Sequence, residues 1–124
     1  MRAALLLAAV LVLASAPRRA DAAPPAPGRY EAVLCVATRP GAEPSCGSVE
    51  ADLRSRARLS LRVADIVYRL ALGPDRIEVA TLHGTMQIDE FDAPYEWQGE
   101  TLRFSDPAKD VRYEVRLGNR LQAR

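Results

Sequence analysis

Hydrophobic and polar residues alternate along most of the chain beyond residue 28. Between Tyr30 and Val36 every second residue is apolar, and between Val111 and Leu117 the intervening residues are charged. Similar alternation recurs near residues 49–54, 58–63, 66–72, 77–79, 86–88, 95–97 and 102–104. A period of two with one polar face is typical of half-buried antiparallel strands.

Turn-forming residues separate these runs. They occur at Gly73-Pro74-Asp75, His83-Gly84, Gln98-Gly99 and Ser105-Asp106-Pro107. Short strands with frequent turns predict an all-β domain: a small antiparallel meander of about eight strands. Such a meander closes into a barrel of lipocalin-like shape or folds into a sandwich, and no lipocalin motif is present.

One stretch also fits a helix. Leu59, Val63, Ile66 and Leu70 follow helical spacing, and Gly73-Pro74 would end a helix well. A helix over residues 60–72 is therefore the alternative to two strands.

The first 22 residues have the order of regions found in a secretory signal peptide. Arg2 precedes the apolar run Leu5–Leu13, and Ala20-Asp21-Ala22 places small residues at the −3 and −1 positions of a cleavage site. The mature chain is expected to begin at Ala23; cleavage after Ala16 ranks second because Pro17 would follow it. The apolar stretch 3–16 is shorter than the roughly 17–25 residues of a spanning helix. We therefore expect a periplasmic or secreted protein without a membrane span after cleavage.

The remaining chain divides into a Pro/Ala-rich linker (23–28), a single β domain (29–118) and a C-terminal tail (119–124). The sequence has 17 basic and 16 acidic residues. Three basic residues and one acidic residue fall in residues 1–22, which leaves a net charge near −1. This balance argues against nucleic-acid binding, which needs a basic excess.

The two cysteines, Cys35 and Cys46, both lie in the exported part. Pro40-Gly41 and Pro44 between them indicate a hairpin loop closed at its base by a disulfide. Two cysteines and one distant histidine make a poor zinc site, and we expect no metal or cofactor.

An acidic and aromatic segment, 89–100, is the most unusual part of the sequence. Tyr95 and Trp97 share one parity and Glu96 has the other, which predicts that both rings point inward. Together with Tyr68 they are candidates for a ligand or partner site, and the alternative is plain core packing. The segment lacks the EF-hand spacing and its glycine, so calcium binding is not favoured.

Arg54, Arg56 and Arg58 also share one parity, and Arg62 is in register with them. On a strand they would form a row of guanidinium groups suited to an anion or an acidic partner. The alternative is a solvated face that pairs with carboxylates on neighbouring strands.

No catalytic motif is present. His83 lies at a turn, and nothing places it near Ser105 or an aspartate. The sequence therefore favours a non-enzymatic protein, most simply a binding module for a small apolar ligand or a cell-envelope protein partner. A periplasmic enzyme inhibitor, an envelope assembly factor and, less favoured, a small hydrolase are the alternatives.

Overall fold

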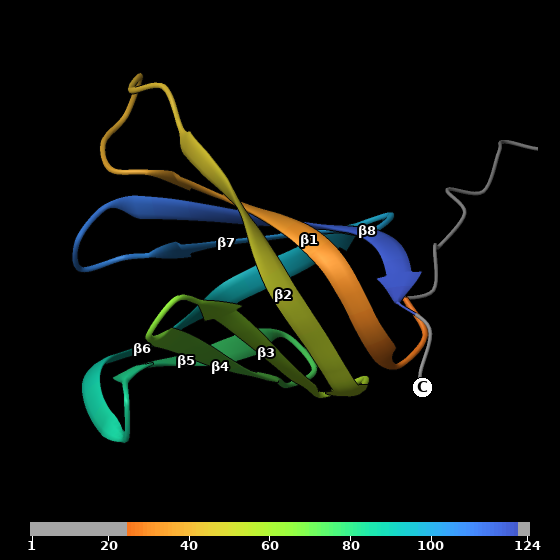
Figure 1. Cartoon of the computed structure of the whole chain (residues 1–124). Coiled ribbons are helices and arrows are strands. Elements are labelled where there is room, and N and C mark those ends of the chain that lie inside the picture. Colours follow the sequence, from red (N-terminus) through yellow and green to blue (C-terminus); the bar gives the residue numbers. More distant parts are fainter. Residues whose placement is uncertain (1–24, 122–124) are drawn as a thin grey trace, which may run out of the picture.

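The computed structural model describes residues 25–121, which form eight antiparallel strands in a closed barrel (Figure 1). The strands are β1 (Gly28–Ala37), β2 (Ser45–Ser55), β3 (Arg58–Val63), β4 (Ile66–Leu72), β5 (Arg76–His83), β6 (Met86–Gln98), β7 (Thr101–Asp106) and β8 (Val111–Leu121). Each strand pairs with the next along the chain, and β8 pairs with β1. The all-β prediction is confirmed, and the barrel is the correct one of its two architectures. The expected signal peptide and the last three residues lie outside the described residues.

The helix alternative over residues 60–72 is wrong. Val63 pairs with Ile66 across a two-residue turn, and Ala64 in that turn has a φ of 55°. The alternation decides between the two structures, because a strand pair buries Leu59, Leu61 and Leu70 on one face while Arg58, Arg62 and Arg69 face outward.

β6 joins two runs that the sequence suggested were separate strands. Phe91 and Ala93 continue the inward parity from Asp89 to Tyr95, so residues 86–98 form one long strand. Its partner changes along its length: Arg76–His83 of β5 pair with residues up to Pro94, and β7 pairs only with Tyr95–Gln98. Pro94 has no N–H to donate, which suits a position where a ladder ends.

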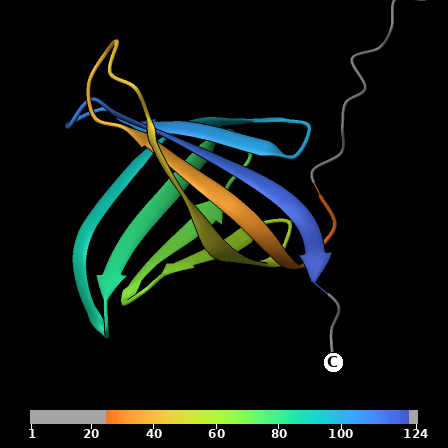
Figure 2. The same cartoon turned by 45° about the horizontal axis from the view of Figure 1, so that its top comes forward.

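Seventeen buried apolar residues fill the barrel, and they come from all eight strands. The disulfide Cys35–Cys46 joins directly opposite residues of β1 and β2 and closes the projecting loop 38–44 at its base, as predicted. Figure 2 shows this hairpin rising above the rest of the barrel. Among residues 25–121 no free cysteine occurs.

The last strand is longer than predicted. β8 continues past Gly118-Asn119 to Leu121 through a bulge opposite Glu31. A side chain at position 118 would place its Cβ 3.2 Å from the Glu31 carbonyl oxygen, so the close approach favours glycine. Arg120 donates a hydrogen bond to the carbonyl of Pro27 and ties the two ends of the domain together.

Candidate functional site

The two ends of the barrel differ, because two of the strand ladders do not extend to one of them. The chain ends and the turns 56–57, 73–75 and 99–100 lie at the terminal end. The loops 38–44, 64–65, 84–85 and 107–110 lie at the opposite end, which we call the mouth end. There β2 pairs with β3 only from Glu50 onward, and β6 pairs with β7 only from Tyr95 onward.

These two interrupted ladders divide the mouth end into two groups of strands. One group contains β7, β8, β1 and the first part of β2, and the other contains β3, β4, β5 and the first part of β6. Figure 1 shows the two groups diverging toward the left of the view. We call the space between them the mouth.

Four aromatic rings meet where the groups begin to diverge. Tyr68 and Phe91 come from one group, and Phe104 and Tyr113 come from the other. Tyr113 stacks on Phe104 and Phe91 with centroid separations of 5.0 and 5.9 Å, and it meets Tyr68 edge to face at 6.4 Å. The cluster therefore forms the floor of the mouth.

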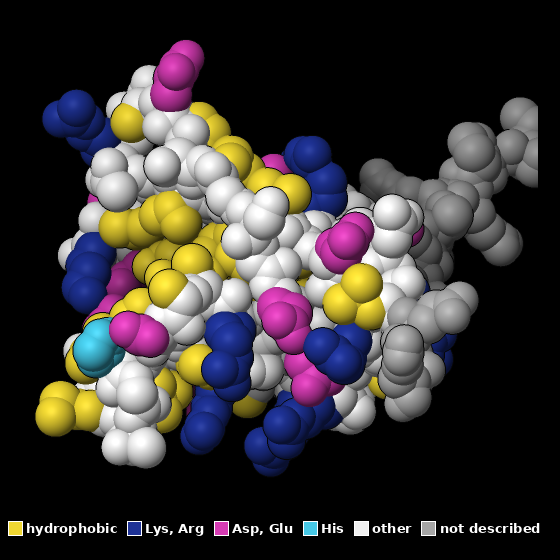
Figure 3. Space-filling model, in the orientation of Figure 1, with side chains coloured by type: hydrophobic (Ala, Val, Ile, Leu, Met, Phe, Trp, Pro, Cys, Tyr) yellow, Lys and Arg dark blue, Asp and Glu magenta, His cyan; other side chains and the backbone are white. Residues whose placement is uncertain are grey.

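Partly exposed apolar side chains surround this floor. Val36 and Val63 stand near the mouth ends of β1 and β3, and both pack against the core without being fully covered. In Figure 3 apolar side chains fill the hollow between the projecting hairpin and the strands below it. The mouth thus presents apolar surface that the fold itself does not bury.

The tyrosine hydroxyls at the two ends of the barrel differ in their hydrogen bonding. At the terminal end Tyr30 donates a hydrogen bond to the Ala26 carbonyl, and Tyr95 donates one to the Gly73 carbonyl. Within the described part of the chain the hydroxyls of Tyr68 and Tyr113 have no such partner. As far as residues 25–121 show, these two polar atoms of the mouth are thus available to a ligand.

Burial changes the acidity of both free phenols. It raises the pKa of Tyr68. It also raises the pKa of Tyr113 to about 12, with smaller contributions from Tyr68, Asp106 and Asp89. Both groups are therefore neutral hydrogen-bond donors at physiological pH.

An ion pair joins the two strand groups beside the aromatic rings. Lys109, in the β7–β8 turn, donates to Asp89 of β6 at 2.9 Å, and this contact lowers the pKa of Asp89. The turn itself is held by Asp106, whose carboxylate accepts a hydrogen bond from the Ala108 N–H. A polar contact therefore spans one side of the mouth.

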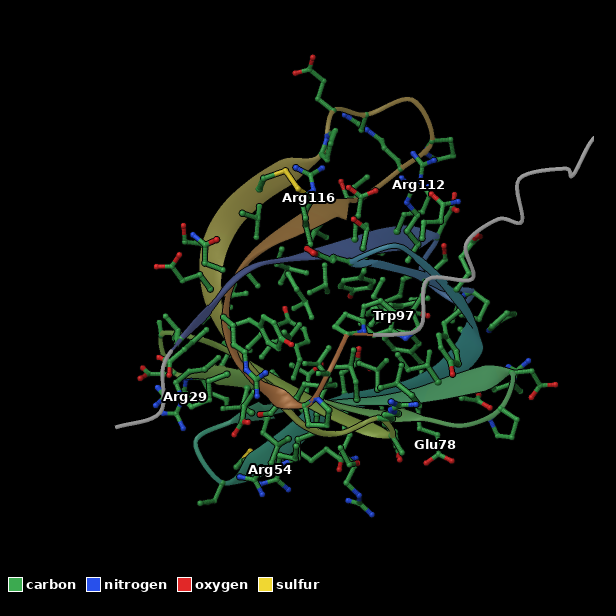
Figure 4. The ribbon with its side chains drawn as sticks, turned by 90° about the vertical axis from the view of Figure 1, so that its right-hand side faces the viewer. Arg29, Arg54, Glu78, Trp97, Arg112 and Arg116 are labelled. Atoms are coloured by element: carbon green, nitrogen blue, oxygen red, sulfur yellow. A yellow bond between two sulfur atoms is a disulfide. The ribbon has the colours of Figure 1, made fainter. Side chains whose placement is uncertain are left out.

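Of the predicted aromatic site residues, only Tyr68 lies at the mouth. Tyr95 and Trp97 point inward, as their parity predicted, but they sit toward the terminal end. Both are partly buried and pack against the core. Figure 4 shows Trp97 inside the ring of strands. The three residues therefore do not form one site.

The predicted row of arginines is also only partly correct. Arg54 and Arg58 point outward, but Arg56 lies in the β2–β3 turn, because a bulge in β2 shifts the register there. Arg54 and Arg58 line an outer hollow of about 600 Å³ over β2–β6, together with Arg62. Figure 4 places Arg54 and Glu78 on this outer side.

A second hollow, of about 700 Å³, lies beneath the disulfide-closed hairpin, and Phe104 and Tyr113 of the mouth floor are among the residues that line it. Ala37, Ala42 and Pro44 line one side of it, and Arg112 lies on the strand beside them.

The structure does not bring together the other candidate catalytic or metal-binding residues of the sequence. His83 is exposed at the end of β5, and Ser105 lies on β7, so β6 separates them. Across residues 25–121 no three His, Cys, Asp or Glu side chains gather in a way that could hold a metal ion. In the acidic segment, Asp89 and Asp92 form ion pairs with Lys109 and Arg76.

Sequence reasoning missed Phe91, Phe104 and Tyr113 as a group. Their alternation shows that each points inward, but nothing in the chain order shows that β4, β6, β7 and β8 bring their rings together across the barrel. That the hydroxyls of Tyr68 and Tyr113 lack hydrogen-bond partners among the described residues could likewise be seen only in the closed barrel.

No protein-family model, curated protein or solved structure matches this chain. Separately, the part of the chain that the structure describes contains no helix with the length and apolar character needed to cross a lipid bilayer.

Proposed function

We propose that this protein is a binding module that holds a small apolar ligand in the mouth. The observation that carries the proposal is the pair of hydroxyls of Tyr68 and Tyr113, which have no hydrogen-bond partner among residues 25–121 and lie in a largely apolar hollow with the Lys109–Asp89 ion pair on one side. Pockets that bind small molecules typically combine apolar walls with a few convergent polar groups. The ligand class that fits is an apolar molecule with a hydrogen-bond acceptor.

A fluorescence titration tests this proposal. The aromatic amphiphile 1-anilinonaphthalene-8-sulfonate serves as the probe, and decanoate serves as the competitor. We expect saturable binding at one site and displacement of the probe by decanoate. Loss of one hydrogen bond in Tyr113→Phe should weaken binding about 2–10-fold.

Tyr95→Phe is the matched control, because it removes a tyrosine hydroxyl at the terminal end. Its affinity for the probe should equal that of the unmodified protein. Near-ultraviolet circular dichroism confirms that each variant is folded. Equal affinity of the Tyr113→Phe, Tyr68→Phe and Tyr95→Phe variants would show that the mouth is not the site.

A protein partner is the second candidate, and the projecting hairpin favours it. The loop 38–44 stands clear of the barrel and is held by the Cys35–Cys46 disulfide, which limits the ordering cost of binding. Native mass spectrometry of the protein from its own compartment separates the two candidates. An adduct of a small apolar molecule supports the mouth, whereas a stoichiometric protein complex supports the hairpin.

We also propose that the protein works in the periplasm or outside the cell. The order of regions in residues 1–22 supports export. The disulfide agrees with this, because such bonds persist in oxidising compartments.

A further inference from the structure

The outer hollow over β2–β6 has an ordered distribution of charge. Four arginines line it from β2, β3 and β4, and two glutamates line it from β5 and β6. The arginines are Arg54, Arg58, Arg62 and Arg69, and the glutamates are Glu78 and Glu90. We call this hollow the outer groove, with a basic side and an acidic side.

Strand register sets the spacing between the two sides. Arg58 lies opposite Ala71, which in turn lies opposite Glu78. In the next row Ala80 separates Arg69 from Glu90. Arg58 and Arg69 are thus each two strands away from the glutamate of their row, or about 10 Å between backbones. Arg69 and Glu78 lie diagonally on the neighbouring strands β4 and β5, and no ion pair joins them among the described residues. The small alanine side chains leave the middle of the groove open.

Elsewhere on the barrel, opposite or diagonal charges on neighbouring strands form ion pairs. Arg103 and Glu114 lie directly opposite each other on β7 and β8 and form an ion pair of 2.8 Å. Arg29 reaches Glu50 on the neighbouring strand at 2.9 Å. In the outer groove, Arg54 contacts Asp52 of its own strand, and the described residues provide no ion pair to Arg58, Arg62 or Arg69.

We propose that the outer groove binds a small zwitterion, with its oxyanion on the arginines and its ammonium group on Glu78 and Glu90. The guanidinium fork matches the geometry of a carboxylate or phosphate, and the carboxylates accept hydrogen bonds from an ammonium group. A ligand with only negative charge would face Glu78 and Glu90, and a ligand with only positive charge would face the arginines. This site is separate from the mouth, which lies on the inner side of the strands.

Titration of the ¹⁵N-labelled, disulfide-bonded protein with phosphoethanolamine tests the proposal. The backbone amides of Ala71 and Ala80, on the floor of the groove, should shift in a saturable manner. Phosphoethanolamine should bind at least tenfold more tightly than inorganic phosphate or ethanolamine alone. If either single-charge compound binds equally well, or if nothing shifts these amides, the proposal is wrong.

Variants on the two sides of one row sharpen the test. Arg69→Gln and Glu90→Gln should each weaken binding at least fivefold, and both residues are exposed, so the fold should tolerate the changes. Arg39→Gln in the projecting loop is the control and should bind normally. Tyr113→Phe should also bind normally, which distinguishes failure at this site from failure at the mouth. Unchanged binding in both groove variants would overturn the assignment.

The source of the zwitterion is tested with vesicles of phosphatidylethanolamine. Weaker binding to the vesicles than to free phosphoethanolamine supports a soluble ligand. Tighter binding to the vesicles than to free phosphoethanolamine supports a lipid headgroup, and the same two variants should abolish it.

Discussion

Tyr113 contacts three other aromatic rings, and its burial among them changes the pKa of its phenol. Its pKa of about 12 lies above the value of about 10 for an exposed tyrosine, mainly because burial disfavours the phenolate. Above pH 10 the unfolded chain therefore loses this proton more readily than the folded protein. The stability that the neutral phenol provides is complete below pH 10 and is lost as the pH rises toward 12.

An absorbance titration near 295 nm checks this expectation. The titration should contain a late step from Tyr113, and Tyr113→Phe should remove that step. If the variant titrates like the unmodified protein, the buried position of Tyr113 is wrong.

Trp97 packs against the core but remains partly exposed. Full truncation of a buried tryptophan costs roughly 3–5 kcal/mol. We therefore expect Trp97→Ala to lower the free energy of unfolding by a smaller amount, about 1.5–3 kcal/mol, in urea denaturation. Met86→Ala on the same strand is the control, since Met86 is 68% exposed and should change stability by about 0.5 kcal/mol or less. Equal effects of the two changes would contradict the inward position of Trp97.

At the scale of elements, the β1–β2 hairpin depends on its covalent bridge. The disulfide closes a short loop and removes denatured-state entropy worth about 3 kcal/mol in the chain-entropy model. Replacing both Cys35 and Cys46 by alanine should lower the free energy of unfolding by about that amount. Reduction of the unmodified protein should have the same effect. A free thiol in the unreduced protein, or an unchanged unfolding midpoint after reduction, would contradict the bridge.

The sequence predicted the individual strands better than it predicted how the strands pair with one another. Alternation gave the faces of β3, β4 and β8 correctly, because one side of each strand must be buried. It did not show that β6 changes partner near Pro94, or that a bulge moves Arg56 into a turn, because both depend on pairing between strands. The mouth could not be predicted, since it arises where two ladders stop early.

At the scale of the whole molecule, all eight strands of the described residues belong to one barrel, and this barrel follows the expected signal peptide. Protein recovered from its native compartment should begin at Ala23, because Ala20 and Ala22 occupy the positions that signal peptidase reads. Intact-mass measurement checks this. Retention of residues 1–22 in the recovered protein would rule out the proposed export.

The order of strands also bears on how the chain reaches its fold. Seven of the eight ladders join neighbours in the sequence, and only β1–β8 joins the two ends of the domain. Local hairpins form with little loop-closure entropy, so the long-range β1–β8 ladder should limit the folding rate. The same proximity of the ends permits circular permutation. In a chain with residues 28 and 121 joined and opened at the turn 64–65, β1–β8 becomes a local hairpin and β3–β4 becomes the ladder that joins the two ends, so the slow closure should move to β3–β4.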